Sequence, residues 1–120
     1  MGARDRQWRN LVLMNTKAQR ICRYRFAVDV SQGIVGRITL WSDGSQPIGE
    51  IVGLETGQHL PPPRIAGDLS HATTFVGADA LPALVDVLRH EKDVFMCIDN
   101  APPGFVTIKA GMVEMQVGSR

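Results

Sequence analysis

Aspartate and histidine side chains stand at spacings that could support acid–base chemistry in two parts of this chain. Asp86 and His90 are four residues apart, which places them on one side of a helix and lets the carboxylate orient the imidazole as a general base. His59 and His71 flank a run of three prolines, with Asp68 between them, but a metal site there would need at least one further ligand. A small hydrolase that uses Asp68/His71 or Asp86/His90 as its acid–base groups is therefore one alternative.

Structural roles explain the same residues more simply. His90 falls in the last turn of the predicted helix, where a cation complements the helix dipole, and His59, Asp68 and His71 are ordinary polar loop residues. Cys22 and Cys97 each lie in an apolar, strand-like run, so we expect buried free thiols rather than a disulfide or a nucleophile. The chain has no Gly-x-Ser-x-Gly, phosphate-binding glycine loop or His-Glu-x-x-His motif. We therefore expect no cofactor and no metal, and favour a binding role over catalysis.

Charge is distributed unevenly along the chain. Residues 1–25 carry seven basic side chains and one acidic one, whereas the remaining 95 residues carry six basic and eleven acidic ones. A basic front with interleaved aromatic residues could bind single-stranded nucleic acid, which is a second alternative. The net charge of +1 is far below that of dedicated nucleic-acid domains. The sequence therefore favours a solvated basic edge, or one that meets the acidic body of a second subunit.

The strands that must position these groups begin with a hairpin. Residues 21–30 and 34–41 alternate apolar and polar side chains, the pattern of half-buried strands. A three-residue loop, Ser31-Gln32-Gly33, keeps both apolar rows on one side, with Gly33 in the left-handed conformation. This register places Phe26 opposite Ile38 and Arg23 opposite Trp41. The row that begins with Cys22 and includes Tyr24, Phe26, Val28 and Val30 is expected to face the core.

A second turn, Asp43-Gly44, predicts a two-residue hairpin that brings Arg37 opposite Glu50. The third strand then places a glycine-rich row on the core side: Pro47, Gly49, Ile51 and Gly53. An apolar row points outward: Val35, Trp41, Ile48, Val52 and Leu54. Because monomers seldom expose a contiguous apolar patch of this size, we expect this row to be the interface of a homodimer.

The rest of the chain predicts one long connector, one helix and three further strands. Residues 55–75 read as an arm stiffened by Pro61-Pro62-Pro63. A helix over about 79–91 has a single apolar stripe, with Pro82 in its first turn and Asp79 as its cap. Strands are predicted at 94–99, 104–109 and 112–117, the last two joined by an Ala110-Gly111 turn, with a further N-terminal strand at residues 8–14. The expected fold is a single α+β domain over 1–120, with one helix packed on a mostly antiparallel sheet.

The stretch Trp41-Ser42-Asp43-Gly44-Ser45, together with residues 75–89, resembles small uncharacterised bacterial α+β proteins of the kind carried on mobile, integron-type gene cassettes. The resemblance implies a bacterial protein without an assigned activity, and it implies no catalytic residue.

A binding function follows from the predicted elements. We expect a cytoplasmic homodimer that does not enter membranes, because no apolar run approaches the ~20 residues that span a bilayer. Its ligand, a small apolar molecule or a peptide, is expected in the concavity between the glycine-rich strand, the helix and the proline arm. The candidate polar contacts there are His59, Arg64, Asp68 and His71.

Overall fold

The computed structural model describes residues 16–111 and 113–117, which form strands, one short 3-10 turn and one α-helix. In chain order the elements are β1 (Thr16–Arg20), β2 (Arg23–Ser31), β3 (Ile34–Trp41), β4 (Pro47–Leu54), β5 (Arg64–Ile65), β6 (Ala72–Gly77), η1 (Ala78–Ala80), α2 (Leu81–His90), β7 (Val94–Asp99), β8 (Phe105–Ala110) and β9 (Val113–Val117). The strand proposed for residues 8–14 lies outside the described residues.

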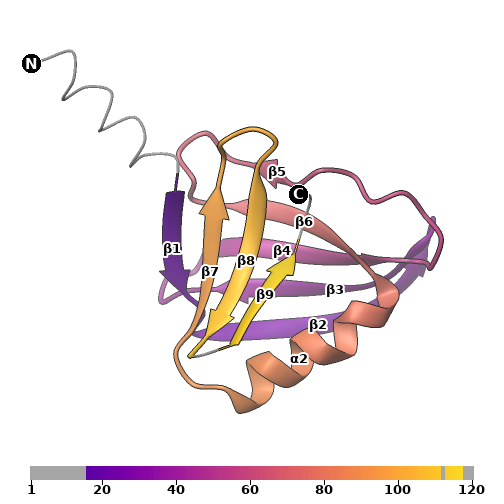
Figure 1. The fold of residues 1–120 in the computed structure, drawn as a ribbon. Helices are drawn as coiled ribbons and strands as arrows, with labels where there is room; N and C mark the ends of the chain where they lie inside the picture. Colours follow the sequence, from indigo (N-terminus) through magenta and orange to yellow (C-terminus); the bar gives the residue numbers. More distant parts are fainter. Residues whose placement is uncertain (1–15, 112, 118–120) are drawn as a thin grey trace, which may run out of the picture.

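The described strands divide between two sheets that cross steeply (Figure 1). Sheet A has the order β1-β7-β8-β9 and is antiparallel throughout, and sheet B has the order β2-β3-β4-β6-β5. Sheet B is mixed, because β4 and β6 pair in parallel. The α+β class and the mostly antiparallel pairing are thus confirmed. The expected arrangement of two three-stranded groups in one sheet is wrong.

The core lies between the two sheets and alternates along their strands as a half-buried sheet requires. From sheet A it takes Val94, Met96, Ile98, Val106 and Ile108. From sheet B it takes Ile38, Leu40, Ile51, Ala72 and Val76. The chain crosses from one sheet to the other at two adjacent residues: the N–H of Ile21 donates to Val94 in sheet A, and the N–H of Cys22 donates to Trp41 in sheet B.

The hairpin β2–β3 has the predicted register over most of its length. Phe26 lies opposite Ile38 and Arg23 opposite Trp41. The loop differs from the prediction: Ser31 pairs with Ile34 around a two-residue turn, and an irregularity between Val28 and Ser31 supplies the extra residue. Gly33 has the expected positive φ of 82°, and Gln32 has one of 54°, the conformation of a tight hairpin turn.

Two other hairpins are displaced by two residues from their predicted registers. Arg37 lies opposite Val52 rather than Glu50, and Ile108 lies opposite Met115 rather than Val113. Asp43 and Gly44 sit in a loop between β3 and β4 instead of forming a two-residue turn, because Gly44 does not adopt the positive φ that such a turn needs. A displacement of two preserves the face that a strand's side chains take, but Ile48, expected on the outer face, belongs to the core cluster and lies beside the irregularity between Leu40 and Trp41.

The helix is the element that the sequence described most accurately. Leu81 and Leu84 are buried and Val85 and Leu88 are half-buried, which confirms the apolar stripe. Pro82 lies in the first turn as expected. The predicted cap is wrong: Asp79 belongs to η1, and no side chain caps either η1 or α2.

The predicted arm contains two strands. β5 pairs with β6, and β6 then runs parallel to β4, so residues 55–75 serve mainly as a crossover between neighbouring strands of one sheet. Alternation in β6 is real, but its inward side chains include Ala72 and Thr74, which are too weakly apolar to stand out in the sequence. β1 has one apolar residue, Ala18, among four polar ones and therefore gives no periodic signal.

Candidate functional site

The predicted ligand concavity is filled by side chains from the core. A Cβ on Gly53 would lie 2.4 Å from Cδ1 of Leu81, and one on Gly49 would lie 2.6 Å from Sδ of Met96. The glycines of β4 therefore admit a helix side chain and a sheet A side chain rather than a ligand. This corrects the expectation of an open groove beneath the arm.

The four predicted ligand contacts differ in exposure and in the side chains that they contact. His59, Arg64 and Asp68 are exposed and His71 is half-buried. Among the described residues, no hydrogen bond or ion pair joins any two of these side chains. The guanidinium of Arg64 instead stacks over the ring of Phe75, 5.8 Å from its centroid. His71 borders a separate polar hollow beside the loop between β3 and β4.

Asp68 has a local structural role. Its Oδ1 accepts hydrogen bonds from the Ser70 hydroxyl at 2.6 Å and from the Ser70 backbone N–H at 3.0 Å. These two bonds hold the pKa of the Asp68 carboxyl below its ordinary value. A carboxylate that is held ionised within its own turn is poorly suited to act as a general acid.

The helix pair predicted from its spacing is present. Nδ1 of His90 lies 2.9 Å from Oδ1 of Asp86, with both side chains largely exposed, 63% for the histidine and 72% for the aspartate. The groove that Asp86 borders has no second carboxylate and no imidazole in its lining. Among the residues that the structure describes, no group of three or more potential metal ligands forms. The arrangement matches an exposed contact between side chains one turn apart at the end of a helix.

The predicted interface row is not an exposed face. Val52 is 2% exposed, Ile48 is 6% exposed and Leu54 is 7% exposed within the single chain, while Val35 and Trp41 are half-buried. Ile48 belongs to the core cluster between the sheets. The argument for a homodimer through these residues therefore loses its basis, because they are already buried without a partner.

Two of the four exposed large apolar residues in the described part of the chain lie on β2, an outermost strand of sheet B, and the other two are Leu60 and Phe95. Phe26 is 42% exposed and Val28 is 73% exposed, which corrects the expectation that this row lies in the core. Phe26 does face the helix side of the sheet, since its ring lies 3.0 Å from the position of a Cβ on Gly36. The reason for its exposure is position: no further strand of the described chain covers this edge.

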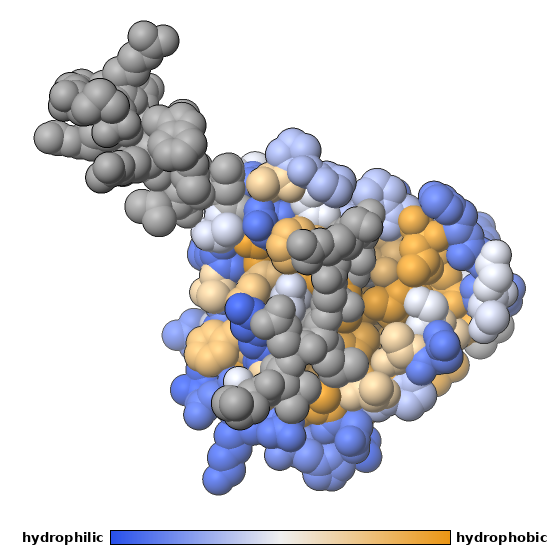
Figure 2. Space-filling view, in the orientation of Figure 1, coloured by the Kyte–Doolittle hydropathy of each residue, from blue (hydrophilic) through white to orange (hydrophobic). Residues whose placement is uncertain are grey.

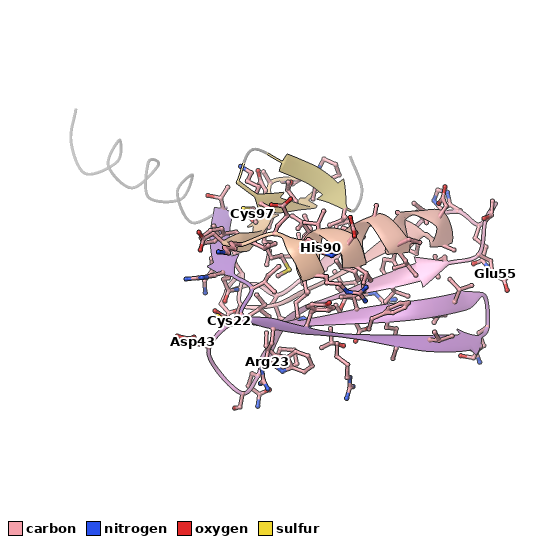
Figure 3. The ribbon with its side chains drawn as sticks, turned by 90° about the horizontal axis from the view of Figure 1, so that it is seen from below. Cys22, Arg23, Asp43, Glu55, His90 and Cys97 are labelled. Carbon is pink, nitrogen blue, oxygen red and sulfur yellow. The ribbon has the colours of Figure 1, made fainter. Side chains whose placement is uncertain are left out.

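A groove of about 440 Å³ runs between β2 and α2. Its walls are mostly apolar, and charged side chains stand at its rim. It is lined by Phe26, Ala78, Leu81, Pro82, Val85, Asp86 and Arg89. Figure 3 shows α2 on one side of the β2–β3 hairpin, with His90 on the helix and Arg23 at the start of β2. Figure 2 shows apolar surface over the end of sheet B that is distant from β1. The alternation that includes Phe26 and Val28 was the sequence signal for this site. The sequence does not show, however, that β2 lies at the edge of its sheet.

Basic residues of the N-terminal strands are partly engaged. Arg23 lies over the ring of Trp41, 4.9 Å from its centroid, as the register predicted. Nη2 of Arg20 pairs with Oδ1 of Asp93 at 3.0 Å. Nη1 of Arg37 pairs with Oε1 of Glu50 at 2.9 Å, a diagonal contact that survives the displaced register.

Neither cysteine is in a disulfide, as expected, but the two are not buried. Cys22 is exposed at the point where the chain crosses between the sheets, and Cys97 is half-buried on the outer face of sheet A, between Ala18 and Thr107. Cys22 borders a hollow of about 530 Å³ with basic and acidic residues on its rim.

No protein-family model matches this chain, and comparisons with curated proteins and with solved structures gave no significant match. The resemblance to gene-cassette proteins therefore stays a prediction. Within the described residues, no helix is long and apolar enough to cross a membrane.

Proposed function

We propose that this protein acts by binding rather than by catalysis, and that its binding surface is the edge of sheet B formed by β2, with the groove between β2 and α2. The ligand is an extended peptide segment with alternating apolar side chains, which adds to the sheet as a further strand. Backbone hydrogen bonds along the edge supply affinity in this mode, and pockets for alternate side chains supply selectivity.

The observation that carries the proposal is the coincidence of an open strand edge with an apolar row. Phe26 and Val28 are exposed large apolar residues of β2, and both precede the irregularity near Ser31. Proteins usually protect long edge strands by charge, proline or coverage. Here the side of β2 that faces α2 is apolar, and the groove beside Phe26 offers room for a side chain.

The exposure of the candidate acid–base groups supports binding over hydrolysis. Asp86 and His90 lie at the surface of the helix, and their carboxylate–imidazole contact is open to water. His59 and Asp68 are exposed as well. Acid–base catalysis depends on groups that meet in one pocket with a reacting atom between them.

Binding of a fluorescein-labelled peptide with alternating threonine and valine, measured by fluorescence polarisation, tests the proposal. The protein should bind this peptide more tightly than a peptide in which every valine is replaced by serine. Phe26→Asp should weaken binding at least tenfold, because it places a charge beside the groove.

Phe95→Asp is the matched control, since Phe95 is exposed to a similar degree, 37%, but lies on sheet A. This variant should keep its affinity. Equal affinity in both variants, or no preference for the valine peptide, would refute the proposed site.

A further inference from the structure

The polar hollow that His71 borders lies where β1 of sheet A meets the starts of β4 and β6 of sheet B. Its volume is about 740 Å³, and its walls come from Gln19, the loop over residues 42–46, the first two residues of β4, Ser70 and His71. It shares no lining residue with the groove between β2 and α2. Its ligand is therefore independent of the peptide proposed for that groove.

Hydrogen-bonding side chains dominate the walls of the polar hollow. Seven of its ten lining residues carry a polar side chain: Gln19, Ser42, Asp43, Ser45, Gln46, Ser70 and His71. Serine hydroxyls and glutamine amides each offer donors and acceptors, and the carboxylate of Asp43 adds two acceptor oxygens. Among the described residues that line it there is no lysine or arginine, and Asp43 carries the one acidic group. The hollow thus combines many hydrogen-bonding groups with little charge.

This composition selects a class of ligand. An apolar molecule would leave the wall groups that it covers without partners, which costs free energy. A phosphate or a carboxylate would meet no cation in the lining and would lie near the carboxylate of Asp43. A sugar hydroxyl both donates and accepts, as the wall groups do. We propose that the polar hollow binds a neutral polyhydroxylated ligand of the carbohydrate class, with Pro47 and Ile48 supplying apolar contact for the ring carbons.

The wall that carries Ser70 is held in place by the chain itself. Oδ1 of Asp68 accepts hydrogen bonds from the hydroxyl and the backbone N–H of Ser70. Leu69, between them, is 5% exposed and has a φ of 62°, so its side chain fixes the turn to the core in a conformation that leucine rarely adopts. Nε2 of Gln19 donates to the Ser70 carbonyl at 3.4 Å and ties the turn to β1. A site that is ordered beforehand loses less conformational entropy on binding.

Three wall groups keep hydrogen-bonding capacity for a ligand. The Ser70 hydroxyl donates to Asp68 and can still accept, and Gln19 keeps its amide oxygen. In the part of the chain that the structure describes, no hydrogen bond or ion pair engages the side chain of Asp43. A carboxylate can accept from two donors at once, and charge-assisted hydrogen bonds are the stronger ones. Because these groups come from three segments of the chain, a ligand that contacts all of them is held from different sides.

A cation is the competing ligand, because Asp43 would attract one. Among the described residues, however, no three potential metal ligands come together. An organic ammonium would use the carboxylate of Asp43 and leave the hydroxyls and amides of the other walls without partners. A sugar with several hydroxyls uses both kinds of group.

NMR titration of the backbone amides tests the proposal with three neutral disaccharides, maltose, cellobiose and lactose, each raised to tens of millimolar. At least one should bind saturably and shift the amide signals of Ser45, Ser70 and His71, which lie on different walls of the polar hollow. The amide signal of Val85, which lines the groove beside β2, should not move. Glucosamine, a cation, and gluconate, an anion, should shift the hollow's signals no more than glucose does.

Substitutions at Asp43 separate hydrogen bonding from charge. Asp43→Ala removes both acceptor oxygens and should weaken binding of the best disaccharide by about fivefold or more. Asp43→Asn keeps an acceptor and should retain most of the affinity. Glu55→Ala is the matched control and should bind as the unmodified chain does, since Figure 3 shows Glu55 at the opposite end of sheet B from Asp43. Circular dichroism should show unchanged folding in all three variants, because both residues are exposed.

The proposal is overturned if none of the three disaccharides shifts the hollow's amide signals, or if Asp43→Ala binds the best of them as tightly as the unmodified chain. If glucosamine binds more tightly than glucose and Asp43→Asn abolishes its binding, the hollow is a cation site and the carbohydrate assignment is wrong. Each of these results leaves the peptide proposal untouched, because the groove beside β2 has none of these residues in its lining.

Discussion

At the scale of single residues, several groups that could do chemistry are already engaged in local structure. Asp68 accepts two hydrogen bonds from Ser70, one from the side chain and one from the backbone. His90 contacts Asp86 within one helix. Such contacts form between neighbours in sequence, so the residue types and spacings that suggest catalysis can equally describe turns and helix surfaces.

The pKa of Asp68 can be tested directly. Ser70→Ala removes the hydroxyl donor that contributes most to lowering this pKa, so the pKa should rise toward its ordinary value. A pKa that is lowered in the folded protein stabilises the fold above the unfolded-state pKa and loses that contribution as pH falls through the folded-state value. The variant should therefore show a smaller loss of stability on acidification. Carboxyl-detected NMR titration measures the pKa, and an unchanged value would contradict the assignment of the hydroxyl as its main cause.

At the scale of elements, close approach of α2 and β7 to the glycines of β4 sets the position of the helix on sheet B. Leu81 and Met96 fill the space that the sequence suggested for a ligand. Core side chains pack closely and leave few voids. A row of glycines in a strand is therefore as well explained by close packing as by a binding groove.

Gly53→Ala tests this packing. The added Cβ would lie 2.4 Å from Cδ1 and 2.9 Å from Cγ of Leu81, so the variant should lose about 1–3 kcal/mol of unfolding free energy and show a clearly lower Tm. Gly44→Ala is the control, because nothing lies within 4 Å of its Cβ position. Thermal unfolding followed by circular dichroism compares the two. Equal melting temperatures would mean that the helix does not pack on Gly53.

At the scale of the whole molecule, burial separates the apolar residues that hold the chain together from those that stay exposed. Val52 and Val28 are both valines of sheet B, yet one is 2% exposed and the other is 73% exposed. The apolar row that the predicted register of the β3–β4 hairpin placed on the outside is covered within a single chain. The open apolar surface lies at the β2 edge instead.

Two substitutions test this difference in burial. Val52→Glu buries a carboxylate without a partner and should cost at least about 3 kcal/mol of unfolding free energy. Val28→Glu should leave the unfolding free energy of the monomer nearly unchanged, because its side chain stays in water. Urea denaturation measures both. If Val52→Glu were as stable as the unmodified chain but no longer formed a dimer, the homodimer interface predicted from the sequence would be supported instead.

Much of the local structure could be predicted from the sequence. Six long strands, the helix stripe and the faces of the hairpin side chains follow from periods of 2 and 3.6 residues, which depend on neighbours only. The pairing of Arg23 with Trp41 and of Arg37 with Glu50 could also be anticipated. The candidate ligand residues could not be brought together by the same reasoning, since their convergence depends on distant parts of the chain.

The sequence by itself therefore determined which side chains of each long strand share a face and which stripe of the helix is apolar. Tertiary structure decided the registers of β3–β4 and β8–β9, the parallel pairing of β4 with β6, and the division of the strands between two sheets. It also left β2 at an edge, which is what exposes Phe26 and Val28. The physical reason is that a shift of two residues, or a change of neighbouring strand, preserves the alternation that the sequence records. Only the packing of one sheet against the other selects among these arrangements.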